Sequence, residues 1–308
     1  MNQPRVAVLI PCYNEATAIA KVITGFMASL PAAKVYVYDN NSSDSTAKIA
    51  AEAGAIVRNE SQQGKGAVVR RMFRDIEADF YIMVDGDHTY DASLAPELLY
   101  IALEEQCDLV NGIRRETEDD AYRAGHRLGN TMLTGAVRKI FGDRVQDMLS
   151  GYKVFSRRFV KSFPASSMGF GIETELTVHA LELHMPVAHL EGEYRGRPDG
   201  SASKLNTYRD GIRILWLICQ LFKHERPFAF FSAIGLVFAV GSVVLGIPLV
   251  SEYLHTGLVP RFPTAILATG VMLLGMLSFV TGLVLDTVTR GRREMKMLAY
   301  LSYPFYEG

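Results

Sequence analysis

Cysteine and net charge are both scarce in this 308-residue sequence. Its three cysteines, Cys12, Cys107 and Cys219, are widely spaced and form no CxxC pair. This pattern argues against a disulfide framework and a thiolate metal site, and we expect the thiols to be reduced. The formal net charge is only −1. The chain therefore lacks the basic field that nucleic-acid binding needs, and we predict no nucleic-acid partner.

Two common nucleotide-binding motifs are also missing. The sequence has no GxxxxGK[ST], which excludes a P-loop. No GxGxxG follows its first apolar run, which argues against a dinucleotide site. A secretory signal is not expected, because only the short run Val6 to Ile10 separates Arg5 from Pro11.

Apolar sequence is abundant towards the C-terminal end. Residues 228–250 and 264–285 contain no formally charged residue. At about 1.5 Å rise per residue, either segment is long enough as a helix to cross a hydrocarbon layer about 30 Å thick. Buried core helices are the alternative, but soluble helices rarely run this long without a charge. We predict two transmembrane helices.

Basic residues flank the two apolar segments on their outer sides. Lys223 and Arg226 precede the first segment, and the basic stretch 290–296 follows the second. Cationic flanks stay in the cytoplasm, so we expect an inner-membrane protein with two spans and both termini cytoplasmic.

Residues 205–226 have apolar side chains at helical spacing with charges between them, which predicts an amphipathic helix at the membrane interface. An ordinary domain-closing helix is the alternative. The predicted organisation is a cytoplasmic domain at 1–204, this helix, a two-helix hairpin at 227–286 and a basic cytoplasmic tail at 287–308.

The first 115 residues alternate between strand and helix patterns. The predicted strands are 5–10, 34–38, 55–58, 80–84 and 108–111. The predicted helices are 16–29, 45–53, 65–76 and 94–105. This alternation predicts an α/β domain with a mostly parallel sheet and helices on both faces. Ligands of such domains bind at the carboxyl ends of the strands.

Polar clusters follow the predicted strands. They are Pro-Cys-Tyr-Asn-Glu at 11–15, Asp-Asn-Asn-Ser-Ser-Asp-Ser-Thr at 39–46, Gly-Lys-Gly at 64–66 and Asp-Gly-Asp-His at 85–88. Two carboxylates one residue apart, as in the last cluster, can share a hard divalent cation that neutralises a diphosphate. Glycines beside a lysine allow close backbone approach to phosphate. An aspartate ending a neighbouring strand can accept hydrogen bonds from a nucleobase or ribose.

This order of motifs resembles the family 2 glycosyltransferases, whose nucleotide-sugar-binding fold is called GT-A. The resemblance covers about residues 4–205 and extends through Asp-Met-Leu-Ser-Gly-Tyr-Lys at 147–153 and Gly-Ser-Ala-Ser-Lys at 200–204. The chain is most similar to the polyisoprenyl-phosphate glycosyltransferases, which include dolichyl-phosphate mannose synthase and the bacterial undecaprenyl-phosphate glucosyltransferases. Bacterial members have a two-helix membrane anchor, which the two trailing apolar segments match.

Carried over position by position, the resemblance implies a donor site, an acceptor site and a metal. The implied nucleoside pocket consists of Pro11, Tyr13, Glu15, Asp39 and Asn41. The implied contacts to donor phosphates and sugar come from Lys65, Arg114, Ser150, Arg197, Ser203 and Lys204. The implied catalytic residues are Asp85, Asp87, Asp147 and Glu175, of which Asp85 and Asp87 hold Mg²⁺ or Mn²⁺. The implied acceptor-phosphate contacts are Arg123 and Arg127.

Several of these assignments have plainer alternatives. Core packing is the minor alternative for Tyr13. Asp44 is better explained as a helix cap than as a ligand, and His88 as a solvent-facing loop residue. Glu173 is the competing alignment for Glu175, and both also suit the charged first turn of a helix. The cations at 115, 123, 126 and 138 are alternatively a solvated or membrane-facing basic face. Asn40 and Asn41 stand where many relatives have Asp-Gly, which leaves base and sugar preference open.

The implied reaction is an inverting hexosyl transfer from a nucleotide sugar, with UDP favoured over GDP, to a polyprenyl phosphate such as undecaprenyl phosphate. The implied assembly is a homo-oligomer, with a tetramer as one candidate, since glycines in both spans permit close helix packing. Two other functions stay open. One is the same chemistry on another lipid, glycan or protein acceptor, and the other is a non-catalytic sugar-lipid scaffold.

Overall fold

The computed structural model describes residues 3–116, 134–135, 137–138, 146–164, 171–194, 216 and 218–306. The chain divides into two compact units. The first contains residues 1–214 together with 295–308, and the second contains residues 215–294.

The first unit begins with the strand-helix alternation that the sequence predicts. Its elements are β1 (Val6–Cys12), α1 (Ile19–Ser29), β2 (Lys34–Asp39), α2 (Thr46–Glu52), β3 (Ile56–Asn59), α3 (Lys65–Asp75), β4 (Phe80–Met83), η1 (Ala92–Leu94), α4 (Ala95–Glu104) and β5 (Leu109–Glu116). All five predicted strands and all four predicted helices are present, and no end is shifted by more than five residues. The largest shift is in β5, which runs five residues beyond the predicted end.

The second half of the unit completes a seven-stranded mixed sheet. It adds β6 (Lys153–Ser156), α6 (Arg157–Ser162), α7 (Ile172–Glu182) and β7 (Val187–Tyr194). The strand order is β3-β2-β1-β4-β6-β5-β7. Strand β6 is antiparallel to both of its neighbours, β4 and β5, whereas the other paired strands are parallel. The prediction of a mostly parallel α/β sheet is confirmed.

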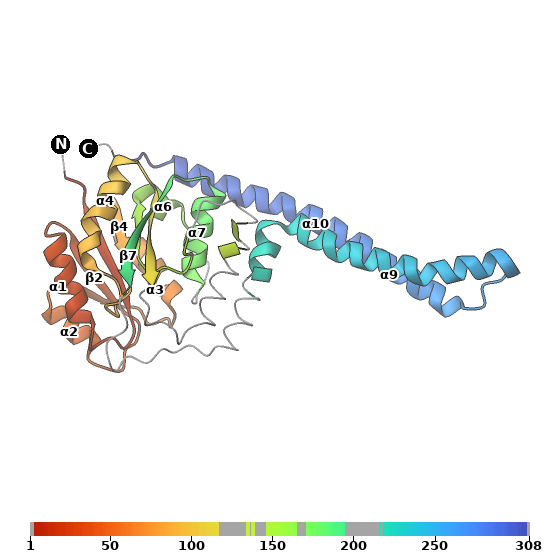
Figure 1. Ribbon diagram of the computed structural model, residues 1–308, viewed down its shortest axis with the longest axis horizontal. Coiled ribbons are helices and arrows are strands. Elements are labelled where there is room, and N and C mark those ends of the chain that lie inside the picture. Colours follow the sequence, from red (N-terminus) through yellow and green to blue (C-terminus); the bar gives the residue numbers. More distant parts are fainter. Residues whose placement is uncertain are drawn as a thin grey trace. The chain divides into compact units, whose positions relative to one another are not determined.

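Helices cover both faces of this sheet and create two hydrophobic cores. On one face, apolar residues of α1, α2 and α4 pack on the strands, with Phe26 and Leu98 fully buried. On the other face, α3, α6 and α7 contribute residues such as Met72 and Phe159. Figure 1 shows α1 and α4 on one side of the strands and α7 on the other. The carboxyl ends of the parallel strands are therefore held between two packed layers.

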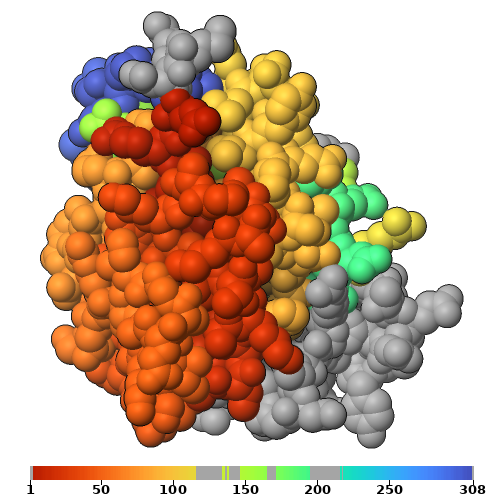
Figure 2. Space-filling view, turned by 90° about the vertical axis from the view of Figure 1, so that its left-hand side faces the viewer, coloured from red at the N-terminus to blue at the C-terminus, as the bar shows by residue number. Residues whose placement is uncertain are grey.

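The last described residues of the chain also belong to the first unit. The Tyr300 hydroxyl donates to Asp108 Oδ2 at 2.7 Å, just before β5. The Arg158 guanidinium lies 4.8 Å from the Tyr300 ring centroid and 4.9 Å from that of Phe305. Phe305 also meets Phe80, the first residue of β4, edge to face. Figure 2 shows this segment (blue) beside the start of the chain (dark red). It packs at the edge of the sheet opposite the strand ends that carry the polar clusters.

The second unit contains two helices that are long and apolar enough to cross a membrane, α9 (Pro227–Thr256) and most of α10 (Phe262–Leu301). A Cβ on Gly235 would lie 2.8 Å from the Gly275 carbonyl oxygen, so the two backbones touch there. The Ser242 hydroxyl donates to the Ala268 carbonyl at 2.7 Å. Apart from Pro227 at the start of α9, the buried residues recur at seven-residue spacing along α9 (Gly235, Ser242, Leu249) and α10 (Ala268, Gly275, Gly282, Thr289). Small residues at this spacing permit close packing of the helix pair.

The predicted juxtamembrane helix is described only in part. Residues 218–225 are helical and Trp216 is 65% exposed, whereas 205–215 and 217 lie outside the described residues. The segment predicted as a basic tail, 287–308, is helical through Leu301, because α10 continues into it.

Candidate active site

The polar clusters that the sequence singles out meet at one edge of the sheet. Strands β1 and β2 are parallel and in register, so Cys12 pairs with Asp39, and β4 lies on the other side of β1. The loops after these three strands therefore converge. This register brings together the 11–15, 39–46 and 85–88 clusters.

Asp39, the last residue of β2, carries a buried carboxylate at the strand ends. Its side chain is buried, and Oδ2 accepts a hydrogen bond from the Ser42 amide at 3.1 Å. The other oxygen, Oδ1, is buried and has no hydrogen-bond partner among the residues that the structure describes. A buried carboxylate oxygen without a partner is costly, and a ligand N–H or O–H group would satisfy it.

The loops after β1 and β2 hold each other in place. The Asn14 amide donates to Ser42 Oγ at 2.9 Å, and the Ser43 amide donates to Asn14 Oδ1 at 2.8 Å. The Glu15 amide donates to Thr46 Oγ1 at 2.8 Å. Asn14 adopts the left-handed backbone conformation, with φ of 56°, which asparagine tolerates. These hydrogen bonds fix the two loops relative to each other before any ligand binds.

The remaining residues of the implied nucleoside pocket lie on these loops with different exposure. Pro11 and Glu15 are half-buried, and Tyr13 is 39% exposed, so Tyr13 is not a core residue. Asn41 is exposed, and its amide donates to the Ser61 carbonyl at 2.7 Å. The N-cap residue of α2 is Ser45, one residue later than the predicted cap Asp44. Asp44 accepts a hydrogen bond from the backbone N–H of Thr46, the first residue of α2, at 3.0 Å.

Asn40 is a positioning residue whose role the sequence pattern does not predict. Its amide nitrogen donates to the carbonyls of Glu60 and Gln62 at 2.9 and 2.8 Å, and its oxygen accepts from the Gly64 amide at 2.7 Å. Gly64, at φ of 127°, starts α3 in a conformation that favours glycine. Asn40 therefore fixes the turn that aims Lys65. The only sequence signal was its place beside Asp39.

Lys65 lies between two carboxylates. Its Nζ is 2.5 Å from Asp85 Oδ1 and 2.6 Å from Glu173 Oε1. Burial alone would lower the pKa of Lys65, but the two carboxylates outweigh it and the pKa is raised. The ammonium is therefore a permanent positive charge at the strand ends. Glu173, on α7, is the acid that meets Lys65; Glu175 is half-buried two residues further along that helix.

The Asp-Gly-Asp turn after β4 is closely packed. A Cβ on Gly151 would lie 2.1 Å from Asp85 Oδ2, so only glycine fits against this carboxylate. Asp87 is buried, and its Oδ1 accepts from the Thr89 hydroxyl at 2.6 Å. Between them, Gly86 lies against Cys12, whose Sγ would be 2.7 Å from an added Cβ. The two carboxylates thus have fixed positions, with Asp85 the more exposed.

Asp147 forms a two-pronged ion pair with Arg114 of β5. The distances are 2.7 Å from Arg114 Nη2 to Oδ1 and 2.8 Å from Nε to Oδ2. Burial alone would raise the pKa of Asp147, but hydrogen bonds from Arg114 outweigh it and the pKa is lowered. Arg114 also lies 5.5 Å from the Tyr194 ring centroid. Both residues remain charged and rigidly oriented.

Ser150 is fully buried, and its hydroxyl donates to the Gly112 carbonyl at 2.5 Å. This bond ties the loop to β5, and the predicted contact of Ser150 with sugar stays a prediction. The neighbouring Gly151 amide donates to the Tyr90 hydroxyl at 2.7 Å. Five predicted site residues, Arg123, Arg127, Arg197, Ser203 and Lys204, lie outside the described residues.

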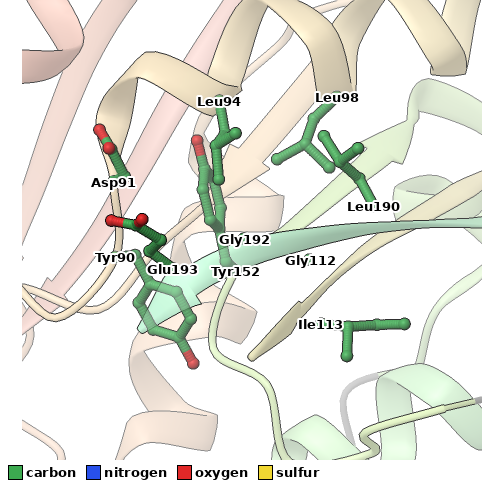
Figure 3. Close-up of a pocket in the computed structure, with 10 residues that line it drawn as sticks. All are labelled: Tyr90, Asp91, Leu94, Leu98, Gly112, Ile113, Tyr152, Leu190, Gly192 and Glu193. Atoms are coloured by element: carbon green, nitrogen blue, oxygen red, sulfur yellow. The ribbon is translucent and has the colours of Figure 1, made fainter. Parts of the chain in front are cut away.

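A small, mainly apolar pocket lies behind this loop. Figure 3 shows Tyr90 with the carboxylates of Asp91 and Glu193 on one side, and Leu98 and Leu190 on the other. Because Tyr90 both lines the pocket and holds the Gly151 amide, the pocket wall supports the loop that contacts Asp85.

Taken together, the strand ends present three features. They are an Asp39 carboxylate oxygen without a partner in the described part of the chain, a carboxylate pair at Asp85 and Asp87, and the Lys65 ammonium between Asp85 and α7. This arrangement can bind a nucleoside through Asp39 and a diphosphate through Lys65 and a cation shared by the pair.

Comparisons with known proteins agree with this chemistry. Residues 7–163 match the sequence profile of the family described as Glycosyl transferase family 2. Glycosyltransferase AglJ of Haloferax volcanii is 36% identical over 250 residues, 80% of this chain and 81% of that protein. A dolichyl-phosphate hexose transferase of the same organism is 24% identical over 220 residues, 71% of this chain and 95% of that protein.

A solved structure has the same fold. It is glucosyl-3-phosphoglycerate synthase from Mycobacterium tuberculosis in complex with Mn²⁺ and uridine-diphosphate-glucose. Its TM-score is 0.60 at 22% identity, and the match covers 71% of this chain and 78% of that one. At this identity the likeness shows the fold alone, which is GT-A.

Proposed function

Because this chain belongs to glycosyl transferase family 2, we propose that it transfers a hexose from a UDP-sugar to the phosphate of a membrane polyprenyl phosphate, such as undecaprenyl phosphate. The chain is a glycosyltransferase, and the proposal concerns its donor, its acceptor and its place in the cell. The observation that carries it is the presence in one chain of the acidic strand-end site and of two helices long and apolar enough to span a bilayer.

The nucleoside end of the donor is assigned to the loops after β1 and β2. The buried Oδ1 of Asp39 has no partner among the described residues and would accept the imide N–H of uracil or a ribose hydroxyl. Pro11, Tyr13 and Glu15 line the approach from β1. The solved neighbour contains uridine-diphosphate-glucose, which supports UDP over GDP as the carrier.

The diphosphate end is assigned to Asp85, Asp87 and Lys65. Carboxylate oxygens are the donors that Mg²⁺ and Mn²⁺ prefer, and Asp85 already faces a cation, the Lys65 ammonium at 2.5 Å. The described residues contain no group of three or more His, Cys, Asp or Glu side chains arranged for a metal. Two carboxylates fit an ion that takes its other ligands from phosphate oxygens and water. When bound, such an ion would neutralise charge on the diphosphate.

In the proposed reaction the acceptor phosphate oxygen forms a bond to the anomeric carbon, and the bond from that carbon to the diphosphate oxygen breaks. Inversion follows from in-line attack. A phosphate that is already ionised needs little help from a general base, so the Asp147–Arg114 pair is assigned to orienting sugar and phosphate groups. Lys65 stabilises the departing UDP. Arg123, Arg127, Arg197, Ser203 and Lys204 remain proposed phosphate contacts.

The lipid acceptor requires a site close to the membrane. Helices α9 and α10 would supply the anchor, with the basic residues at 223–226 and 290–296 on the cytoplasmic side of the inner membrane. The hexose transfer would then occur on the cytoplasmic face. A homo-oligomer, with the tetramer as a candidate, completes the proposal.

The test is a transfer assay with the full chain in detergent. Purified protein would be incubated with undecaprenyl phosphate, Mg²⁺ or Mn²⁺ and a panel of UDP- and GDP-sugars, and mass spectrometry would identify lipid products. We expect a hexosyl-phosphoryl-prenol with one UDP-sugar. Asp87→Ala should abolish product, whereas the exposed control Glu97→Gln on α4 should not.

Each other outcome contradicts a defined part of the proposal. Hydrolysis of donor without lipid product would reject the polyprenyl acceptor. Product from a GDP-sugar alone would reject the UDP assignment. Metal-dependent nucleotide binding without any turnover would favour a non-catalytic scaffold, and full activity of Asp87→Ala would reject the metal site.

A further inference from the structure

A lysine is completely buried at the start of β6, beside the candidate site. Lys153 is 0% exposed, although β6 is otherwise a core strand. It pairs in the sheet with Met83 of β4 and with Asn111 of β5. Lysine is almost never fully buried without a reason, and neither the nucleoside pocket nor the metal pair uses this one.

The Lys153 ammonium has a specific partner, the side chain of Asn111. Its Nζ donates to Asn111 Oδ1 at 2.5 Å. The amide nitrogen of Asn111 in turn donates to the carbonyls of Gln146 and Asp147 at 2.8 and 3.1 Å. A chain of hydrogen bonds thus runs from the buried cation to the loop that carries Asp147.

The direction of these bonds matters. An ammonium group only donates, so it fixes the oxygen of Asn111 towards itself. The NH₂ group of Asn111 must then face the loop, where it satisfies two backbone carbonyls. Asp147 has φ of 44°, a left-handed conformation that aspartate tolerates better than most residues but that its surroundings must still enforce. The Asn111 bonds and the Arg114 ion pair supply that enforcement.

Burying the cation has a cost that a purely space-filling residue would avoid. Burial lowers the pKa of Lys153 to about 8; Asp147 and Glu173 raise it, while Arg114 and Lys65 lower it further. An apolar side chain of similar volume would be better tolerated by a core that had only to fold. We therefore explain the presence of a buried lysine at this position by its orientation of the Asn111 side chain.

We propose that Lys153 is a positioning residue that orients Asn111 and, through it, presets the 146–147 loop and the Asp147–Arg114 pair for the sugar-phosphate end of the donor. The inference rests on the proposed glycosyl transfer for its effect on turnover. The ordering of the loop can be measured without turnover, so the two can fail separately.

The experiment uses the full chain in detergent and compares the wild type with Lys153→Met and Asn111→Asp. The first variant removes the donor and keeps the volume. The second retains a partner for Lys153 but cannot donate to the two carbonyls. Hydrogen–deuterium exchange would follow peptides covering 146–152 and, as internal reference, peptides covering 39–46. We expect exchange about tenfold faster at 146–152 in both variants, with unchanged exchange at 39–46.

Turnover and UDP binding complete the test. With whichever donor the wild type uses, we expect kcat to fall about ten- to a hundredfold in both variants, with affinity for UDP and Mn²⁺ within about threefold of the wild type. The double variant should be no worse than either single one, because both break the same chain of bonds.

Three results would overturn the proposal. They are unchanged exchange at 146–152, exchange raised equally in both peptide sets, which would indicate a general core role, and additive losses in the double variant. If the wild type turns over no donor, the proposed function fails while the exchange data still decide whether Lys153 orders the loop.

Discussion

Replacing Gly151 by alanine is the sharpest perturbation that this structure offers. The added Cβ would lie 2.1 Å from Asp85 Oδ2 and 2.6 Å from Asp85 Cγ. Ordinary van der Waals contact begins near 3.4 Å. The carboxylate must therefore retreat by roughly 1 Å or more, because the Gly151 backbone is held by the Tyr90 hydroxyl at 2.7 Å.

The displacement has two measurable consequences. It breaks the contact between Asp85 and Lys65 and strains the loop, which should lower the free energy of unfolding by about 1 to 3 kcal/mol, as overpacking does. For a domain of this size that is roughly 2 to 4 °C of Tm for each kcal/mol. It also moves a proposed metal ligand by about 1 Å, which should lower turnover by about a hundredfold.

The assay combines thermal unfolding with calorimetric binding of UDP in the presence and absence of Mn²⁺. Gly25→Ala in α1 is the matched control, since its Cβ would meet only the Ala92 Cβ, at 3.1 Å. A second comparison places Gly151→Ala in an Asp85→Ala background, where the clash is gone. There we expect no further loss of Tm from the glycine replacement.

Two results would refute the reasoning. One is a Gly151→Ala protein with the wild-type Tm and wild-type Mn²⁺-dependent UDP binding. The other is an equal loss of Tm in the wild-type and Asp85→Ala backgrounds, which would place the strain elsewhere than on the carboxylate.

Three other contacts make measurable predictions. Asp39→Asn should lower UDP affinity by about tenfold in calorimetry, because the carboxylate oxygen that has no partner among the described residues is lost as a charged acceptor; unchanged affinity would remove Asp39 from the proposed nucleoside site. Tyr300→Phe deletes the bond to Asp108 and should lower the free energy of unfolding by about 1 to 3 kcal/mol in denaturant titrations, and an unchanged midpoint would argue against this docking. The pKa of Asp147 is lowered from 3.8, since Arg114 outweighs burial, so its stabilisation is complete above that pH and is lost as the pH falls below it. Asp147→Asn should therefore lose less Tm than the wild type between about pH 5 and pH 3, whereas parallel curves would contradict the ion pair.

Much of the candidate site was predictable because its residues follow strands directly. Asp39 and Asp85 come at the ends of short apolar runs, and parallel strands present such ends at one edge. The choice between Glu173 and Glu175 was not predictable. Both lie in the first turn of α7, and only the packing of that helix against α3 brings Glu173 to Lys65.

The hydrogen-bond partners of Ser150 and Asn40 were also not predictable from the sequence. Ser150 belongs to a motif that suggests sugar contact, and in the structure its hydroxyl donates a hydrogen bond to the Gly112 carbonyl of β5. Asn40 had no predicted role, yet it holds the turn before Lys65. A sequence pattern records that a polar residue is present, but its hydrogen-bond partner depends on which strand lies beside it.

The sequence by itself determined the α/β alternation, the acidic strand ends and the two long apolar helices. These depend on periodicity and turn chemistry within short stretches of chain, which each segment encodes locally. Only the tertiary structure decided that β6 enters antiparallel between β4 and β5, and so set Gly151 against Asp85 and Lys153 beneath Asn111. The tertiary structure also decided that Tyr300, near the end of α10, bonds Asp108 before β5, and that Phe305 packs on Phe80 at the start of β4. The physical reason is that these contacts join residues far apart in the chain. Their energy comes from the packing of whole layers, which no single segment contains.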